Sequence, residues 1–287
     1  MAKVKVGESV NVDTPLWRYM SLDKLISLLE GNKLFFTPLE SYQNSDPFEG
    51  FMPKVVFEAY SNIFGSEVKE LENAQEQLKV KIGNNQALLN ELSKIKSVTP
   101  DFRELIKQIF KTVTKGITVN CWHANSSESE AMWKLYSDNG KGIAVKTSIS
   151  SLVNSIEKFD QDLLIQIGAV KYLDFHDDKI CPKDCVTDGY LSPLLKRSSF
   201  SHENEVRLFT IPNIDPSNVN NFKAKPEFVQ ALAMDLIEGI YISPFAGEPF
   251  VSSILAICNK YSIPAQIVIK SELLEGHEDL LDNMAKW

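Results

Sequence analysis

Short apolar segments of strand length recur along this sequence, and there are more of them than a simple doubly wound parallel sheet needs. We expect strands at 14–21, 32–38, 117–124, 142–148, 163–174, 203–211, 237–243 and 265–273. Helices of amphipathic spacing are expected at 22–31, 127–137, 149–159 and 247–262. No glycine-rich turn joins a strand to a helix in the manner of a dinucleotide or phosphate loop. The pattern predicts one mixed α+β domain over residues 1–287.

Capping residues mark the ends of two of these helices. Ser21 and Gly31 bound the first helix, and Ser127 with Glu130 has the spacing of a capping box. Such residues satisfy backbone groups that the first and last helical turns leave unpaired.

Residues 52–115 differ from the rest of the chain because Glu, Lys, Gln and Leu dominate much of this stretch. Its leucines and isoleucines predict two amphipathic helices broken at 83–85, followed by a third helix over 99–116. We therefore expect a helical insertion within the domain. Two roles stay open: a solvated insert, or a lid or arm that binds a partner protein.

The charge of the chain limits the classes of partner. The formal net charge is −8, which argues against a general affinity for nucleic acid or anionic membranes. No apolar run approaches the roughly 20 residues of a membrane helix, and the first residues lack an apolar signal core. Four cysteines in 287 residues do not make a disulfide scaffold. A cytoplasmic protein without membrane contact is the expectation.

Two cysteine motifs are candidate chemical sites. Cys181 and Cys185 lie close together with His176 nearby, but a zinc site needs four good ligands, so no metal is expected. Cys121 and His123 would share one face of a strand and could form a nucleophile pair. No recognisable signature surrounds them, and unpaired structural thiols are the simpler interpretation.

The segment "ENEV" is the stronger candidate. On a strand, Glu203 and Glu205 would point to the same face about 6–7 Å apart. Like charges at that distance raise each other's pKa, so stability does not explain the pair. The segment is either a solvated edge face or a pair of carboxylates directed at one substrate.

The loop 41–51, "SYQNSDPFEGF", combines turn residues with two carboxylates. We predict that it borders the same cleft as the glutamates, with Asp46 accepting from backbone amides in an Asx turn before Pro47. A plain surface turn is the alternative.

Several separated segments resemble, in order, a bacterial family of unknown function, DUF2971. They are "LWRYMS", "LISLLEGNKLFFTPLESYQNSDPFEGF", "CWHANSSESEAMWKLYS", "GKGIAVKTS", "SSFSHENEVRLF", "IEGIYISP" and "IVIKSEL". The resemblance covers nearly the full chain except the helical insertion.

A more distant resemblance implies chemistry. "LWRYMS" is similar to the first motif of mono-ADP-ribosyltransferases, and "SHENEVRLFTIP" to their last motif. The resemblance implies NAD as substrate, Arg18 on its phosphates, Glu205 as the catalytic glutamate and Glu203 directed to the acceptor. Tyr19 or Trp122 would stack on the nicotinamide ring. The implied fold is an ADP-ribosyltransferase-like mixed β core.

The implied function is NAD-dependent transfer of ADP-ribose to a protein or nucleic acid, or NAD hydrolysis, in a toxin or anti-phage effector. The middle motif of that superfamily, Ser-Thr-Ser or a tyrosine, is absent: "TVNCWHA" stands in its place, and "VKTS" lies later. The alternative is a non-catalytic binding or sensor module that recognises a partner through its cleft and helical arm. Arg18 and Glu205 in one cleft would favour the enzyme, and a packed core between them the module.

Overall fold

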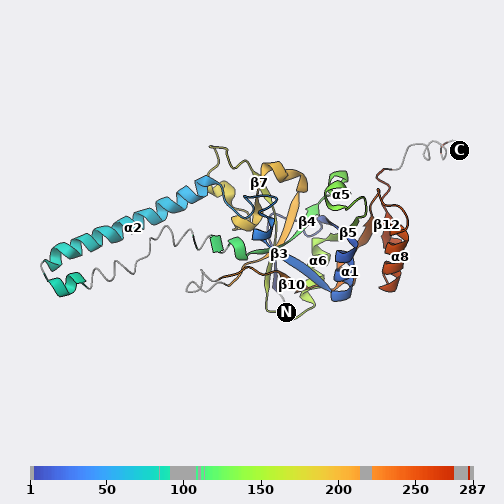
Figure 1. The fold of residues 1–287 in the computed structure, drawn as a ribbon, viewed down its shortest axis with the longest axis horizontal. Coiled ribbons are helices and arrows are strands. Elements are labelled where there is room, and N and C mark those ends of the chain that lie inside the picture. Colours follow the sequence, from blue (N-terminus) through green and yellow to red (C-terminus); the bar gives the residue numbers. More distant parts are fainter. Residues whose placement is uncertain are drawn as a thin grey trace.

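The computed structural model describes residues 3–83, 85–90, 108, 111–112, 114–213, 222–274 and 284. Among these residues a ten-stranded mixed sheet has the order β1-β6-β9-β4-β2-β5-β11-β12, with β3 on β4 and β10 on β3 (Figure 1). The strands are β1 (Lys3–Val6), β2 (Pro15–Met20), β3 (Lys33–Pro38), β4 (Thr118–Ala124), β5 (Ile143–Ser148), β6 (Leu164–Ala169), β9 (Glu205–Thr210), β10 (Glu227–Gln230), β11 (Gly239–Ile242) and β12 (Val268–Lys270). The predicted α+β class is confirmed.

Strand directions make the sheet mixed. The β1–β6 and β11–β12 pairs are parallel, and the other pairs of the large sheet are antiparallel. The single long strand expected at 163–174 is instead two strands, because β6 ends at Ala169 and the chain leaves the sheet. The next segment, β7 (Lys171–Leu173), pairs with β8 (Leu195–Arg197) in a separate two-stranded sheet.

Four helices cover one face of the large sheet: α1 (Leu22–Gly31), α6 (Ile149–Glu157), α7 (Ala233–Leu236) and α8 (Phe250–Lys260). Their apolar side chains form the main core with residues of β2, β3, β5, β6, β9 and β11. Asn32 in left-handed conformation, rather than Gly31, ends α1. The same asparagine binds the start of α7 through its side chain, because Ala233 N donates to Asn32 Oδ1 at 2.9 Å.

The opposite face carries smaller apolar clusters. One lies under α5 (Glu130–Tyr136) and includes Trp17 and Trp133. Another includes Leu194 and Phe209, close to the short 3-10 helices η1 (Leu39–Tyr42) and η3 (Ser192–Leu194). The cap of α5 is Ser129, whose Oγ accepts from Met132 N, so the predicted Ser127 capping box is wrong.

The sheet forks beside β4. One edge of β4 pairs with β9 over its whole length, from Thr118 to His123. Along its other edge, Ala124 and His123 pair with β2, whereas Val119 and Thr118 pair with β3. The middle of β4 therefore faces the opening between β2 and β3.

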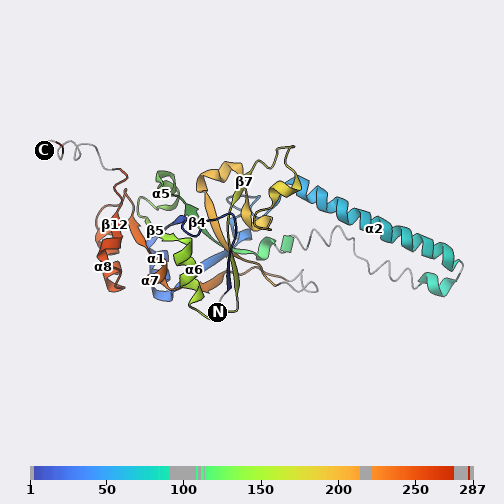
Figure 2. The same cartoon turned by 180° about the vertical axis from the view of Figure 1, so that it is seen from behind.

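The helix α2 (Lys54–Ile82) projects from the body as a long arm (Figures 1 and 2). Its 29 residues span about 44 Å at the usual helical rise. The break predicted at 83–85 is confirmed at Gly83, but the first helix starts much earlier than its leucine pattern indicated. The second expected helix is described only over 86–90, and most of the third, over 99–116, lies outside the described residues.

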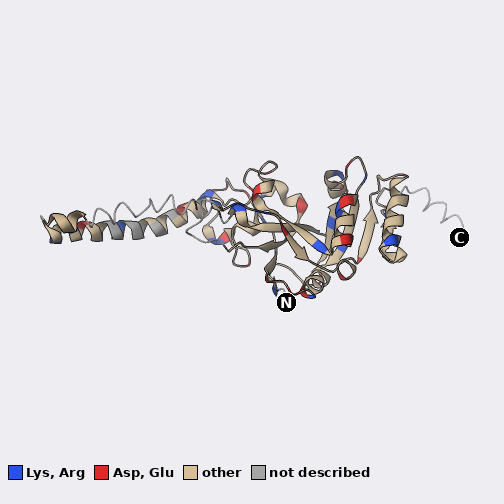
Figure 3. Ribbon diagram, turned by 60° about the horizontal axis from the view of Figure 1, so that its bottom comes forward, with Lys and Arg blue, Asp and Glu red and all other residues tan. Residues whose placement is uncertain are grey.

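Charged residues of both signs are interspersed along the described ribbon (Figure 3). The arm follows this pattern, with exposed ion pairs between Lys54 and Glu58 and between Lys79 and Glu76. Within the described part of the chain, none of the helices combines the length and apolar character that crossing a membrane requires.

Candidate active site

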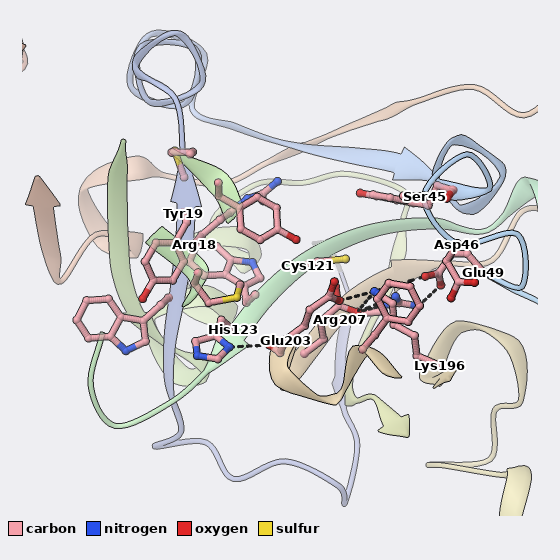
Figure 4. A pocket seen from close by; sticks show the side chains of 18 of the residues that line it. Arg18, Tyr19, Ser45, Asp46, Glu49, Cys121, His123, Lys196, Glu203 and Arg207 are labelled. Atoms are coloured by element: carbon pink, nitrogen blue, oxygen red, sulfur yellow. Dashed lines mark hydrogen bonds and ion pairs between the residues drawn. The ribbon is translucent and has the colours of Figure 1, made fainter. Parts of the chain in front are cut away.

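A cavity of about 420 Å³ opens at the fork in the sheet. Side chains from β2, β4, β9, α5 and the loop 43–51 line it, together with Lys196, Phe200 and Glu203 (Figure 4). The five site residues predicted from the sequence all belong to this lining: Arg18, Tyr19, Trp122, Glu203 and Glu205.

The predicted geometry of Arg18 and Glu205 is confirmed. Arg18 lies on β2 and Glu205 on β9, and both strands pair with β4. In Figure 4, Cys121 lies between Arg18 on one side and Arg207 with Lys196 on the other. The two ends of the cavity are therefore carried by different strands of one sheet.

Glu203 and Glu205 reach the cavity by a route that the sequence pattern did not predict. Only Glu205 is on a strand, because Glu203 ends the 3-10 helix η4 (Ser198–Glu203). Asn204 between them adopts φ 38°, in the left-handed region that asparagine tolerates better than most residues. The expectation that both glutamates share one strand face is wrong, although both line the cavity.

Three hydrogen bonds fasten this turn to the end of β4. His123 Nδ1 pairs with the carbonyl of Glu203 at 2.6 Å, and Ala124 N donates to Asn204 O at 2.9 Å. Asn204 Nδ2 donates back to the carbonyl of Ala124. The backbone positions of the two glutamates are thus fixed by β4.

Arg207 anchors the carboxylate of Glu205. Its Nε and Nη2 lie 2.9 and 2.7 Å from Glu205 Oε2, and its Nη1 lies 2.8 Å from Glu49 Oε1 and 3.1 Å from the carbonyl of Pro193. Arg207 is almost completely buried, so these bonds replace its lost hydration.

Lys196 is the second cation of the cluster. Its ammonium binds Glu203 Oε2 directly and lies 3.6 Å from Glu49 Oε2 and 3.7 Å from Glu205 Oε2. None of the described hydrogen bonds goes to Oε1 of Glu203 or of Glu205. Glu203 therefore has one anchored oxygen and one without a described hydrogen bond, whereas the Cys121 thiol also hydrogen-bonds the carboxylate of Glu205 and helps to lower its pKa.

The two glutamates differ in acidity. Burial raises the pKa of Glu203, and the charge of Glu205 raises it further. Burial also raises the pKa of Glu205, but Arg207 and Lys196 outweigh burial and bring it below its usual value. The predicted mutual effect of like charges is thus confirmed for Glu203 and wrong for Glu205. Two neighbouring carboxyls with separated pKa values are the usual basis for distinct catalytic roles.

The surroundings of Arg18 differ from those of Arg207 and Lys196, which are paired with carboxylates. Its guanidinium carbon lies 5.7 Å from the centre of the Trp122 ring, and burial lowers its pKa. Among the described residues no carboxylate forms an ion pair with it. Lys24, on α1, adds a second cation to the lining. A half-buried arginine without a protein counter-charge is suited to an anionic ligand group.

The aromatic residues expected to stack on nicotinamide are buried. Tyr19 accepts a hydrogen bond from Ser129 N at 2.8 Å and packs edge to face on Trp133, and burial raises its pKa to about 12. Trp122 donates from its indole N–H to Asn120 and lies beneath Arg18.

Tyr136 at the end of α5 offers a more accessible ring. It is 46% exposed and lines the cavity. Burial of its hydroxyl raises its pKa, and the charges of Glu203 and Glu205, which line the same cavity, raise it further.

Cys121 and His123 both line the cavity but do not form a nucleophile pair. The His123 ring binds the Glu203 carbonyl and lies 3.4 Å from Asn125 Nδ2, and no hydrogen bond between it and Cys121 is present. Burial, followed by the charge of Glu205, raises the pKa of Cys121, which keeps the thiol protonated.

The "CPKDC" segment forms a local turn. Cys181 Sγ donates to Asp184, and all four cysteines are free thiols. In the described part of the chain no group of three His, Cys, Asp or Glu residues has the arrangement of a metal site.

The loop 41–51 borders the cavity as predicted, through Ser45, Asp46 and Glu49. The Asx turn is confirmed, because Phe48 N donates to Asp46 Oδ1 at 3.0 Å. Asp46 also pairs with Arg197 at 2.5 Å, so the loop is tied to the segment that carries Lys196.

The sequence interpretation missed Arg207, Lys196 and Tyr136, whereas it predicted that the loop carrying Asp46 and Glu49 borders the cleft. Arg207 had a usable signal, because it lies two positions after Glu205 on a strand and must share its face. The others come from separate segments and show no common pattern in the sequence.

Comparison with family models and with characterised proteins finds no match for the sequence, and comparison with solved structures finds none for the fold. The proposed chemistry therefore depends on the motifs and on the geometry of the cavity.

Proposed function

We propose that the protein is an NAD-dependent ADP-ribosyltransferase-like enzyme that transfers ADP-ribose to a macromolecule or hydrolyses NAD. The observation that carries the proposal is that one cavity holds both Arg18, which has no ion-pair partner among the described residues, and Glu205, an anchored ionised glutamate.

Arg18 is assigned to the diphosphate of NAD. A guanidinium donates two parallel hydrogen bonds to a phosphate group, and its charge stays fixed at neutral pH. The absence of an ion-pair partner among the described residues supports this role, because no ion pair has to be broken before a phosphate binds.

Glu205 is assigned to the ribose. When the bond between C1′ and the nicotinamide nitrogen breaks, the electron pair leaves with nicotinamide and positive charge develops on the sugar. A fixed carboxylate stabilises that charge as it develops, which lowers the barrier rather than tightening ground-state binding. Oε1 of Glu205, the oxygen that Arg207 does not bind, is assigned to this contact.

Glu203 is assigned to the acceptor. The acceptor oxygen or nitrogen forms a bond to C1′, and its proton passes to the free Oε1 of Glu203. A carboxylate with a raised pKa is better matched to accepting a proton near neutral pH than an ordinary glutamate. Water as acceptor gives ADP-ribose, and a side chain or nucleobase gives the transfer product.

A non-catalytic binding module is the competing proposal. The double contact from Arg207 favours it, because this contact offsets part of the negative charge that Glu205 would present to a sugar. The shared cavity of Arg18 and Glu205 favours the enzyme.

Incubation of the purified protein with NAD decides between them. Release of nicotinamide, with or without cell lysate, would support the enzyme, provided that the Glu205→Gln variant does not release it. Labelled NAD would show whether ADP-ribose is transferred to lysate macromolecules. If the wild-type protein binds NAD and releases no nicotinamide under either condition, the enzyme proposal fails.

A further inference from the structure

The charge balance of the carboxylate cluster depends on one lysine. Three carboxylates, Glu49, Glu203 and Glu205, meet two cations, Lys196 and Arg207, so full ionisation leaves a net charge of −1 (two minus three). All five side chains are at most 11% exposed, and water therefore compensates little of this imbalance.

The two cations divide the carboxylates unequally. Arg207 binds Glu205 and Glu49 but forms no ion pair with Glu203. Within the described part of the chain, Lys196 alone forms an ion pair with Glu203. Lys196 also lies between Glu203 and Glu205, at 3.7 Å from the latter.

Lys196 is held in place from several directions. It is on β8, which pairs with β7, and its ammonium lies 4.9 Å from the centre of the Phe200 ring. Its pKa is raised, because the neighbouring carboxylates outweigh the effect of burial, so the charge is retained. The lysine is consequently a fixed positive charge that lines the cavity beside the turn of Glu203.

We propose that Lys196 is a positioning residue that keeps Glu203 ionised and turns its free oxygen toward the acceptor. The catalytic part of this role rests on the proposed function. The effect of Lys196 on the ionisation of Glu203 does not. Without the lysine, Glu203 would face Glu205 with no cation of its own, and its pKa would rise further. A protonated Glu203 cannot accept a proton from an acceptor.

Other charged or titratable groups surround Glu203 and must be included. They are Glu205 and Arg207 on β9, Glu49 in the loop before α2, Tyr136 on α5, Tyr172 on β7 and His123 on β4. None of them is a cation that contacts the Glu203 carboxylate, so none replaces Lys196.

The test measures kcat/KM for nicotinamide release against pH in the wild type and in Lys196→Met. Loss of an opposite charge at contact distance should move the acid limb upward by about one pH unit or more. The rate should then recover at high pH. Lys196→Arg should restore the wild-type limb. The matched control is Lys260→Met on α8, which removes a lysine that lies over Tyr261 outside the cavity lining and should leave the profile unchanged.

A second measurement does not need turnover. A carbon-13 NMR titration of glutamate carboxyls, with Glu203 assigned by its absence in Glu203→Gln, should give a higher midpoint in Lys196→Met than in the wild type. If Lys196→Met does not fold, Lys196→Gln takes its place. An unmoved midpoint in a folded variant overturns the proposal, as does a rate loss that is equal at all pH values. If the midpoint moves but no variant releases nicotinamide, the proposed function fails and the role of Lys196 stands.

Discussion

Arg207 and Glu205 stand two positions apart on β9, and the guanidinium of Arg207 contacts one oxygen of Glu205 through both Nε and Nη2. The contact fixes the orientation of the carboxylate and does not involve its other oxygen. The same arginine binds Glu49, so the loop before α2 and the strand β9 meet at one buried group.

Replacing Glu205 by Gln should reduce the rate of the chemical step while NAD affinity changes little. Glutamine keeps the shape and an acceptor for Arg207 but removes the charge. Losing one electrostatic contact of this kind costs about 10²–10³ in kcat, or roughly 3–4 kcal/mol. Steady-state nicotinamide release and calorimetric titration with NAD separate the two quantities. A wild-type kcat in Glu205→Gln would exclude the catalytic assignment.

Replacing Arg18 by Ala should weaken binding of NAD and of ADP-ribose to the same extent, because both carry the diphosphate. Hydrogen bonds to charged groups contribute about 1.5–3 kcal/mol, so we expect a loss of roughly 10- to 150-fold in affinity. Arg18→Lys should give an intermediate value, since it keeps the charge and loses the planar fork. The control is Lys260→Ala on α8, which removes a cation outside the cavity lining. Equal affinities in wild type and Arg18→Ala would contradict the assignment.

Tyr136 should act as the platform for the nicotinamide ring. Tyr136→Leu should weaken the affinity for NAD by roughly 2- to 12-fold, because one aromatic contact contributes about 0.5–1.5 kcal/mol. ADP-ribose, which lacks nicotinamide, should bind as before, and Tyr136→Phe should behave like the wild type. Competition binding measures the affinities of the wild type and of both variants for NAD and for ADP-ribose. A loss of ADP-ribose affinity equal to that of NAD would place the ring elsewhere on the ligand.

Glu203 and Glu205 should affect stability with opposite signs as pH changes. The folded pKa of Glu203 is raised, so its contribution is present below the unfolded pKa of about 4.3 and is lost as pH rises through the folded pKa. The folded pKa of Glu205 is lowered, so its contribution is present above about 4.3 and is lost as pH falls through the folded pKa.

As pH rises above about 4.3, Glu203→Gln should therefore become more stable relative to the wild type. As pH rises toward about 4.3, Glu205→Gln should become less stable relative to the wild type. Urea denaturation at a series of pH values measures both differences. A Glu203→Gln variant that falls below the wild type as pH rises would show that its ion pair with Lys196 outweighs burial.

The strands that build the cavity were largely predictable. The apolar patterns at 14–21, 117–124 and 203–211 correspond to β2, β4 and β9, because short apolar segments bounded by turn residues are typical of buried strands. β1 and β10 were not predicted. Each is four residues long, and their patterns carry too few buried positions to stand out.

The site was predictable where it follows strand geometry and not where it depends on turns. Arg18 and Glu205 line one cavity as predicted, but they leave opposite faces of the sheet and share the cavity only because the sheet forks beside β4, which the sequence did not predict. The conformation of Asn204 could not be read from "ENE", because three hydrogen bonds to β4 select it. Lys196 joins the site through contacts with carboxylates distant in sequence, which no local pattern records.

The arm α2 begins next to the cavity, and this placement has a mechanical consequence. Met52 and Val56 are buried at its base, whereas Glu49, five residues before Lys54, belongs to the cavity wall. For a helix of about 44 Å that pivots about this buried base, a tilt of about 5° displaces the far end by about 4 Å. The base of the arm thus lies a few residues along the chain from Glu49, which binds Arg207.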